Sequence, residues 1–119
     1  MVQITTPAAK TPEQISDEIR ALVQRLRDGD PEVRRVRPSN LTISNLGATG
    51  VEAFVPIVNP PEAAVLGIGT VSPAVVALDG QVAIQHRVAL TLAVDHRVVN
   101  GRYAADFLQS VVRELEAVA

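Results

Sequence analysis

Apolar residues near the N-terminus recur at helical spacing. Thr11 is the expected N-cap of this helix, Pro12 its first residue and Gln14 the reciprocal partner in a capping box. Gly29 is expected to end it. The apolar stripe that follows the cap consists of Ile15, Ile19, Leu22, Val23 and Leu26. This pattern predicts one amphipathic helix with a solvated basic face.

Most of the remaining pattern is typical of short strands. The runs Ala63 to Val71 and Val88 to Val94 are mainly apolar, which favours strands buried on both faces. Further strands are expected at Val2 to Thr6 and Leu41 to Leu46, an extended stretch at Phe54 to Val58, and a hairpin of Val75 to Ala77 and Val82 to Ile84 around an Asp79-Gly80 turn. A last helix, capped by Asn100, carries the stripe Phe107, Leu108, Val111, Val112 and Leu115. The order strand, helix, several strands, helix predicts an α/β (α+β) sandwich, in which helices pack on a mixed sheet within one domain over residues 1–119.

Composition narrows the possible functions. The 119 residues are 47% hydrophobic but only 3% aromatic, so the core is expected to be aliphatic. A net charge of -2 gives no electrostatic basis for nucleic acid or an anionic membrane as partner. The chain has no cysteine and two histidines, so we expect no disulfide, no thiol nucleophile and no metal site. Without a leader-like or membrane-spanning run, the expected location is cytoplasmic.

The segment Asp95-His96-Arg97-Val98-Val99-Asn100-Gly101 is the strongest candidate for chemistry. It stands where a buried strand ends and a helix begins, a position at which a strand fixes a side chain and a loop exposes it. The histidine pKa lies near working pH, so His96 could act as a general base. The alternative is a structural histidine in a loop closed by an Asp95–Arg97 surface ion pair. Spacing alone leaves both interpretations open.

Three ordered segments carry a resemblance to a known family. The first is Asp95 to Gly101, which resembles the pattern Asp-His-Arg-x-x-Asp-Gly of the dihydrolipoamide acyltransferases of 2-oxoacid dehydrogenase complexes. The others are Thr42-Ile43-Ser44-Asn45-Leu46-Gly47 and the run from Ile57 through Asn59-Pro60-Pro61-Glu62 to Gly67. The resemblance implies a fold like that of chloramphenicol acetyltransferase and covers the C-terminal half of the family's catalytic domain.

The resemblance also implies residue roles. His96 matches the general base that takes a proton from the acceptor thiol, and Ser44 matches the hydroxyl that stabilises the tetrahedral oxyanion. In the family these two groups come from neighbouring subunits of a trimer, so a homotrimer is expected. Asn100 stands where the family usually has Asp; it keeps hydrogen-bonding capacity but has no charge, and it could also serve only as a helix cap.

The implied reaction moves a short acyl group between a thioester of coenzyme A or lipoamide and a thiol or hydroxyl acceptor. The substrate would be a small molecule or a lipoyl protein, with no tightly bound cofactor and no metal. Because the family domain is longer, a separate polypeptide carrying its first half is a possible partner. A non-catalytic assembly subunit is the alternative function. Arg97 could pair with Asp95 or contact a phosphate of coenzyme A, and His86 is expected to be an ordinary surface histidine.

Overall fold

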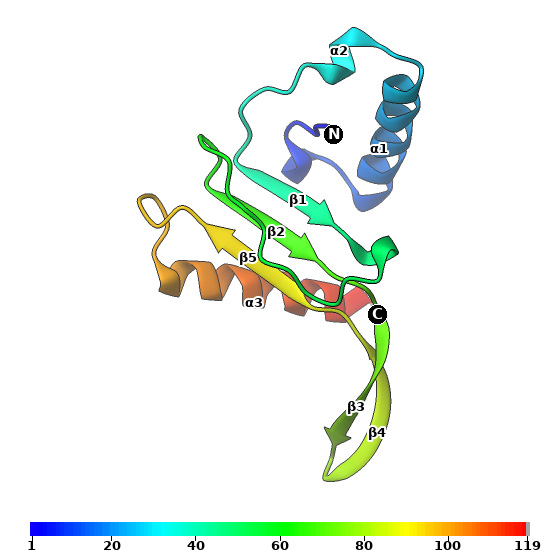
Figure 1. The fold of residues 1–119 in the computed structure, drawn as a ribbon, viewed down its shortest axis with the longest axis vertical. Coiled ribbons are helices and arrows are strands. Elements are labelled where there is room, and N and C mark those ends of the chain that lie inside the picture. Colours follow the sequence, from blue (N-terminus) through cyan, green and yellow to red (C-terminus); the bar gives the residue numbers. More distant parts are fainter. Residues whose placement is uncertain (119) are drawn as a thin grey trace. The chain divides into compact units, whose positions relative to one another are not determined.

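The computed structural model describes residues 1–118, which fall into two compact units. The first unit is Met1–Pro38 and the second begins at Ser39. The element order is η1 (Pro7–Ala9), α1 (Pro12–Arg27), α2 (Pro31–Arg34), β1 (Leu41–Asn45), η2 (Gly47–Thr49), β2 (Ala64–Ile68), β3 (Ser72–Leu78), β4 (Gln81–Arg87), β5 (Leu90–Val94) and α3 (Gly101–Val118), as drawn in Figure 1. The mixture of helices and strands confirms the α/β prediction.

The first unit is built on α1, and its predicted capping box is present. The Thr11 hydroxyl accepts the Gln14 amide N–H at 3.2 Å, and the Gln14 side chain accepts the Thr11 amide N–H at 2.8 Å. The helix ends at Arg27 and is followed by Gly29 at φ 82°, a backbone conformation that favours glycine. The end of α1 therefore follows from local sequence, as predicted.

The strand predicted at Val2 to Thr6 was wrong. No strand of the described residues pairs with this segment, so its backbone lacks the ladder that defines a strand. Instead the Gln3 side chain bridges to Arg37, donating to its carbonyl at 2.9 Å and accepting its N–H at 3.1 Å.

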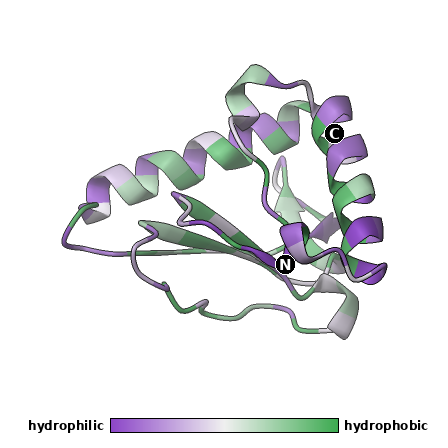
Figure 2. Ribbon diagram, turned by 90° about the horizontal axis from the view of Figure 1, so that it is seen from above, coloured by the Kyte–Doolittle hydropathy of each residue, from purple (hydrophilic) through white to green (hydrophobic). Residues whose placement is uncertain are grey.

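The second unit contains a mixed sheet in the order β1-β2-β5. β1 and β2 run parallel, whereas β2 and β5 run antiparallel. Val65, Leu66 and Gly67 of the central strand are buried, which confirms a buried strand within the predicted run Ala63 to Val71. The strand is shorter than predicted, because it ends at Ile68 and Val71 is 61% exposed. α3 lies along β5 (Figure 1), and the strands of the sheet are mainly hydrophobic (Figure 2).

β3 and β4 form a separate hairpin that extends away from this sheet (Figure 1). Asp79 and Gly80 have φ of 50° and 77°, as a two-residue hairpin turn with positive φ at both positions requires. The hairpin prediction is therefore confirmed. Three large apolar residues share one of its faces, and their exposed fractions are 74% for Val75, 81% for Val82 and 73% for Ile84.

The connection from β1 to β2 is long and largely irregular. It starts with η2, turns at Gly50 with φ 79°, and continues through residues 51–63, where the predicted extended stretch forms no strand. Its first part runs against the end of β2, because Thr70 N–H donates to the Val51 carbonyl at 2.8 Å. A Cβ added to Gly69 would lie 1.9 Å from the Glu52 carbonyl oxygen, so only glycine fits there.

Candidate active site

The loop from Asp95 to Asn100 joins the end of β5 to the start of α3, as the sequence predicted. Its first residue is held by the backbone on both sides. The Asp95 N–H donates to the Ala63 carbonyl at 2.8 Å, and the Asp95 carbonyl accepts the N–H groups of Val98 and Val99, each at 3.0 Å. The loop is thus a tight turn, although its side chains are largely exposed.

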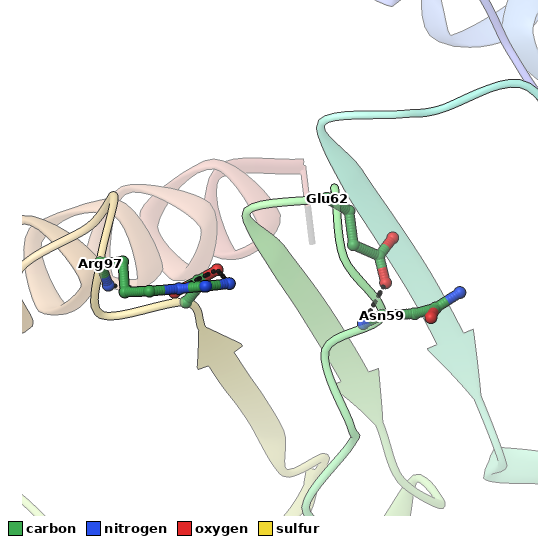
Figure 3. A network of polar contacts seen from close by, with 4 residues as sticks. Asn59, Glu62 and Arg97 are labelled. Carbon is green, nitrogen blue, oxygen red and sulfur yellow. Dashed lines mark hydrogen bonds and ion pairs between the residues drawn. The ribbon is translucent and has the colours of Figure 1, made fainter.

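Asp95 and Arg97 form an ion pair across His96 (Figure 3). One carboxylate oxygen of Asp95, Oδ1, accepts Arg97 N–H and Nε–H, both at 3.0 Å. The other, Oδ2, accepts Nη2–H at 2.8 Å and Nε–H at 3.3 Å. Hydrogen bonds from the Arg97 side chain, and then from its backbone N–H, lower the pKa of Asp95 to about 2. The Asp95 hydrogen bond likewise raises the pKa of Arg97.

His96 lies between these two paired residues, and its side chain is exposed. Both carboxylate oxygens of Asp95 are engaged by Arg97, so this carboxylate is not arranged as a direct partner of the imidazole. The predicted Asp95–Arg97 pair is confirmed, and the exposed imidazole of His96 takes no part in it.

Asn100 closes the loop and caps α3, as predicted. Its side-chain oxygen Oδ1 accepts the Tyr103 N–H at 2.8 Å, and its carbonyl accepts the Ala104 N–H at 3.0 Å. The amide oxygen is therefore occupied by the helix, whereas the amide nitrogen keeps its donors.

Ser44 lies on β1, where it pairs with Gly67 of β2. Its side chain is half-buried, and it shares a face of the strand with Thr42. A shallow open hollow lies beside this end of β1 and is lined by Asn45, Gly47, Ala48, Ile68, Gly69, Thr70 and Val71.

The structure does not bring Ser44 and His96 together within one chain. Ser44 and Gly67 are in register with Thr91, whereas Val94, next to the histidine loop, is in register with Ala64 and Leu41. The cross-strand row that contains Ser44 and the row that contains Val94 are about 10 Å apart along the strands. The strands β1 and β5 are themselves about 10 Å apart across the sheet. The two candidate groups therefore lie at opposite ends of the sheet.

Glu62 is a polar residue that sequence reasoning did not single out. It is only 8% exposed, and its carboxylate accepts the Asn59 N–H at 3.0 Å (Figure 3) and the Thr42 hydroxyl. A buried carboxylate is costly unless it is hydrogen-bonded, and here both oxygens are. Glu62 ties the proline turn to β1 two residues before Ser44. The available signal was a lone carboxylate at the start of a buried strand.

Neither a metal cluster nor a membrane-spanning helix is found in the part of the chain that the structure describes. No group of three His, Cys, Asp or Glu residues could hold a metal ion within residues 1–118. Over the same residues, no helix is both long and apolar enough to cross a bilayer.

Comparison with known proteins decides the family. The family of 2-oxoacid dehydrogenases acyltransferase (catalytic domain) matches residues 3–119. The chain belongs to this acyltransferase family. The succinyltransferase component of the 2-oxoglutarate dehydrogenase complex from Haemophilus influenzae is 38% identical over 103 residues. That match covers 87% of this chain and 25% of the relative, so the chain spans about a quarter of the relative's length.

Solved structures of the acyltransferase family have the same fold. A probable dihydrolipoamide acetyltransferase from Listeria monocytogenes aligns with a TM-score of 0.85 and 28% identity, over 92% of this chain and 47% of that one. The dihydrolipoamide acetyltransferase of Azotobacter vinelandii gives 0.76 and 35%, over 86% of this chain and 42% of that one. The Azotobacter structure comes from work on the role of a serine, a histidine and an asparagine in that enzyme's catalytic mechanism.

Proposed function

We propose that this chain transfers a short acyl group between a thioester of coenzyme A or lipoamide and a thiol or hydroxyl acceptor. The observation that carries the proposal is the triplet Ser44, His96 and Asn100. These residues have the same types and the same sequence spacings as the serine, histidine and asparagine studied in the Azotobacter enzyme. In this proposal the chain is one domain, equivalent to the C-terminal half of the family's catalytic domain.

The proposed reaction begins with proton transfer. The His96 imidazole takes the proton of the acceptor thiol, and the thiolate attacks the thioester carbonyl. A tetrahedral oxyanion forms, to which the Ser44 hydroxyl donates a hydrogen bond. When the intermediate collapses, the carbon–sulfur bond to the donor breaks, and the departing thiolate takes the proton back from His96. Asn100 fixes the end of the histidine loop through its contact with α3.

In this proposal each site is shared between two copies of the chain, arranged as a homotrimer. The separation of Ser44 and His96 within one chain supports a site in which one copy supplies the serine and its neighbour the histidine. The hairpin β3–β4 supports self-association, because nothing within residues 1–118 covers its exposed apolar face of Val75, Val82 and Ile84. Cyclic assembly brings one end of a subunit to the other end of the next.

Mixing two inactive variants tests this arrangement. His96→Ala keeps the serine, and Ser44→Ala keeps the histidine. After the two are unfolded and refolded together, random pairing gives intact sites at about a quarter of the interfaces, so about a quarter of the wild-type rate is expected. If the mixture is as inactive as its components while wild-type protein is active, the shared site is wrong. With a hydroxyl acceptor each turnover releases one thiol, which a thiol reagent can follow because the protein has no cysteine. With a thiol acceptor the number of thiols does not change, so the acylated product is separated and measured by chromatography.

A second candidate function is an assembly subunit without catalysis. It is favoured by the exposed apolar face of the hairpin, Val75, Val82 and Ile84, which suits association without any catalytic step. In that case the partner would be a separate polypeptide that carries the remaining part of the domain. The substrate of the assembled enzyme would be a small molecule or a lipoyl protein. Wild-type protein that stays inactive even with this part supplied would favour the assembly role. The proposed compartment is the cytoplasm.

A further inference from the structure

The residues on either side of His96, Asp95 and Arg97, are joined by an ion pair and several hydrogen bonds. The guanidinium of Arg97 donates hydrogen bonds to both carboxylate oxygens of Asp95, at 2.8 Å for the shortest. The same carboxylate accepts the backbone N–H of Arg97 at 3.0 Å. A ring of hydrogen bonds thus spans His96 without using the imidazole.

The anchor of this ring is well fixed and its far end is exposed. Asp95 has a side chain only 16% exposed and a backbone held by Ala63, Val98 and Val99, whereas the Arg97 side chain is 79% exposed. An ion pair at the surface normally contributes little to stability, because solvent screens it and two side chains must be ordered. A two-pronged contact has another consequence: it restricts the backbone of the residue that it spans.

We infer that Asp95 and Arg97 are a positioning pair, which holds the exposed loop in the one conformation that presents His96 to its substrate. The inference rests on the proposed function, in which His96 is the base. Proton transfer needs donor and acceptor heavy atoms within about 3 Å, and a misplacement of about 1 Å can cost about a hundredfold in rate. An exposed loop without this pair would sample several backbone conformations, few of which are productive.

The competing role for Arg97 is a contact with a phosphate of coenzyme A. That role requires the guanidinium to leave Asp95, or to bind the phosphate through the nitrogen Nη1, for which no contact with Asp95 is observed. The two roles predict different kinetics. Loss of a phosphate contact weakens binding of coenzyme A thioesters alone, whereas loss of positioning slows turnover with every donor.

The experiment compares Arg97→Gln, Arg97→Lys and Asp95→Asn with wild type. The acyl donors are an acyl coenzyme A and an acyl-lipoamide, which has no phosphate, and both are used with the same phosphate-free thiol as acceptor. For Arg97→Gln we expect kcat to fall about 10- to 100-fold with both donors and KM to stay within about twofold. Arg97→Lys should recover part of the lost rate, because lysine keeps the positive charge but cannot bind both carboxylate oxygens of Asp95 in the bidentate way of a guanidinium. Arg102→Gln is the matched control, since Arg102 also forms an exposed ion pair, with Asp106 at 3.4 Å.

A second measurement does not require turnover. Amide hydrogen exchange at Val98 and Val99, both bonded to the Asp95 carbonyl, should accelerate in Arg97→Gln and stay unchanged in Arg102→Gln. Unchanged exchange would overturn the positioning role, even in a preparation that shows no activity. A rise in KM for acyl coenzyme A alone, at constant kcat, would overturn it in favour of the phosphate contact. If the wild-type protein is inactive but exchange is faster in Arg97→Gln, the result would count against the proposed function. It would not count against the role of Asp95 and Arg97 in holding the loop.

Discussion

Ser44 and His96 lie at opposite ends of the same three-stranded sheet. Ser44 on β1 is in register with Gly67 and Thr91, whereas His96 follows Val94, at the other end of the antiparallel strand β5. A hydroxyl and an imidazole placed in this way cannot act on one carbonyl within a single chain. The relationship makes the state of association central to the proposed activity.

His96→Ala should remove most of the acyl-transfer activity and leave the fold intact. A positioned general base contributes a factor of about 10² to 10⁴, and the exposed ring makes little contribution to packing. Steady-state thioester turnover measures the loss, and circular dichroism checks the fold. His86→Ala is the control, because His86 is an exposed residue of β4, remote from the loop. Undiminished turnover in His96→Ala would refute the mechanism.

Ser44→Ala should lower kcat about 10²- to 10³-fold, because one donor to the oxyanion is lost. Combined with His96→Ala, the two losses should be less than multiplicative, since both groups act on the same step. Thr42→Ser is the comparison on the same face of β1 and should leave kcat unchanged, because serine keeps the hydroxyl that binds Glu62 and Thr42 has no proposed contact with substrate. A rate in Ser44→Ala equal to that of wild type would exclude the hydroxyl from the mechanism.

Asn100→Ala should destabilise the chain by about 1 kcal/mol, because the cap of α3 is lost. Asn100→Ser keeps a capping oxygen and should restore stability. Chemical unfolding measures the difference, and turnover of the two variants separates the roles of Asn100. If Asn100→Ser is as stable as wild type but slow, the amide contributes to the site beyond its cap. Full activity in Asn100→Ser would limit the residue to capping.

Ile84→Asp should weaken self-association. The substitution places a charge on the apolar hairpin face, where Ile84 pairs with Val75 and is 73% exposed. Sedimentation velocity at micromolar concentration should show smaller species than for wild type. Val118→Asp is the control, since Val118 is 84% exposed at the end of α3. Association that is equally strong in Ile84→Asp would exclude this face, and a wild-type monomer would contradict the trimer.

Arg97→Gln should raise the pKa of Asp95 from about 2 towards its ordinary value of 3.8, because the largest cause of the lowering is removed. The Arg97 backbone N–H remains and should keep part of the shift. A carboxylate with a lowered pKa stabilises the folded loop above pH about 4, and this contribution is lost as the pH falls towards about 2. Carbon NMR of the Asp95 carboxyl group follows the titration. The same midpoint in variant and wild type would contradict the assigned cause.

Local features of this chain could be predicted from its sequence because their causes are local. The capping box of Thr11 and Gln14, the hairpin turn at Asp79 and Gly80, and the Asn100 cap all depend on residues within a few positions of one another. The Asp95–Arg97 pair belongs to the same class, since its partners are separated only by His96. The family, too, is indicated by residue identities alone, because three ordered motifs carry the resemblance.

Only the tertiary structure decided which of these residues meet. The apolar run that contains Leu66 predicted a buried strand, but its parallel pairing with β1 and antiparallel pairing with β5 depend on contacts between distant segments. Those pairings place Ser44 and His96 at opposite ends of the sheet, and no spacing in the sequence encodes that separation. Val2 to Thr6 failed as a strand for the same reason: a strand needs a partner's backbone, which the segment's own residues cannot supply.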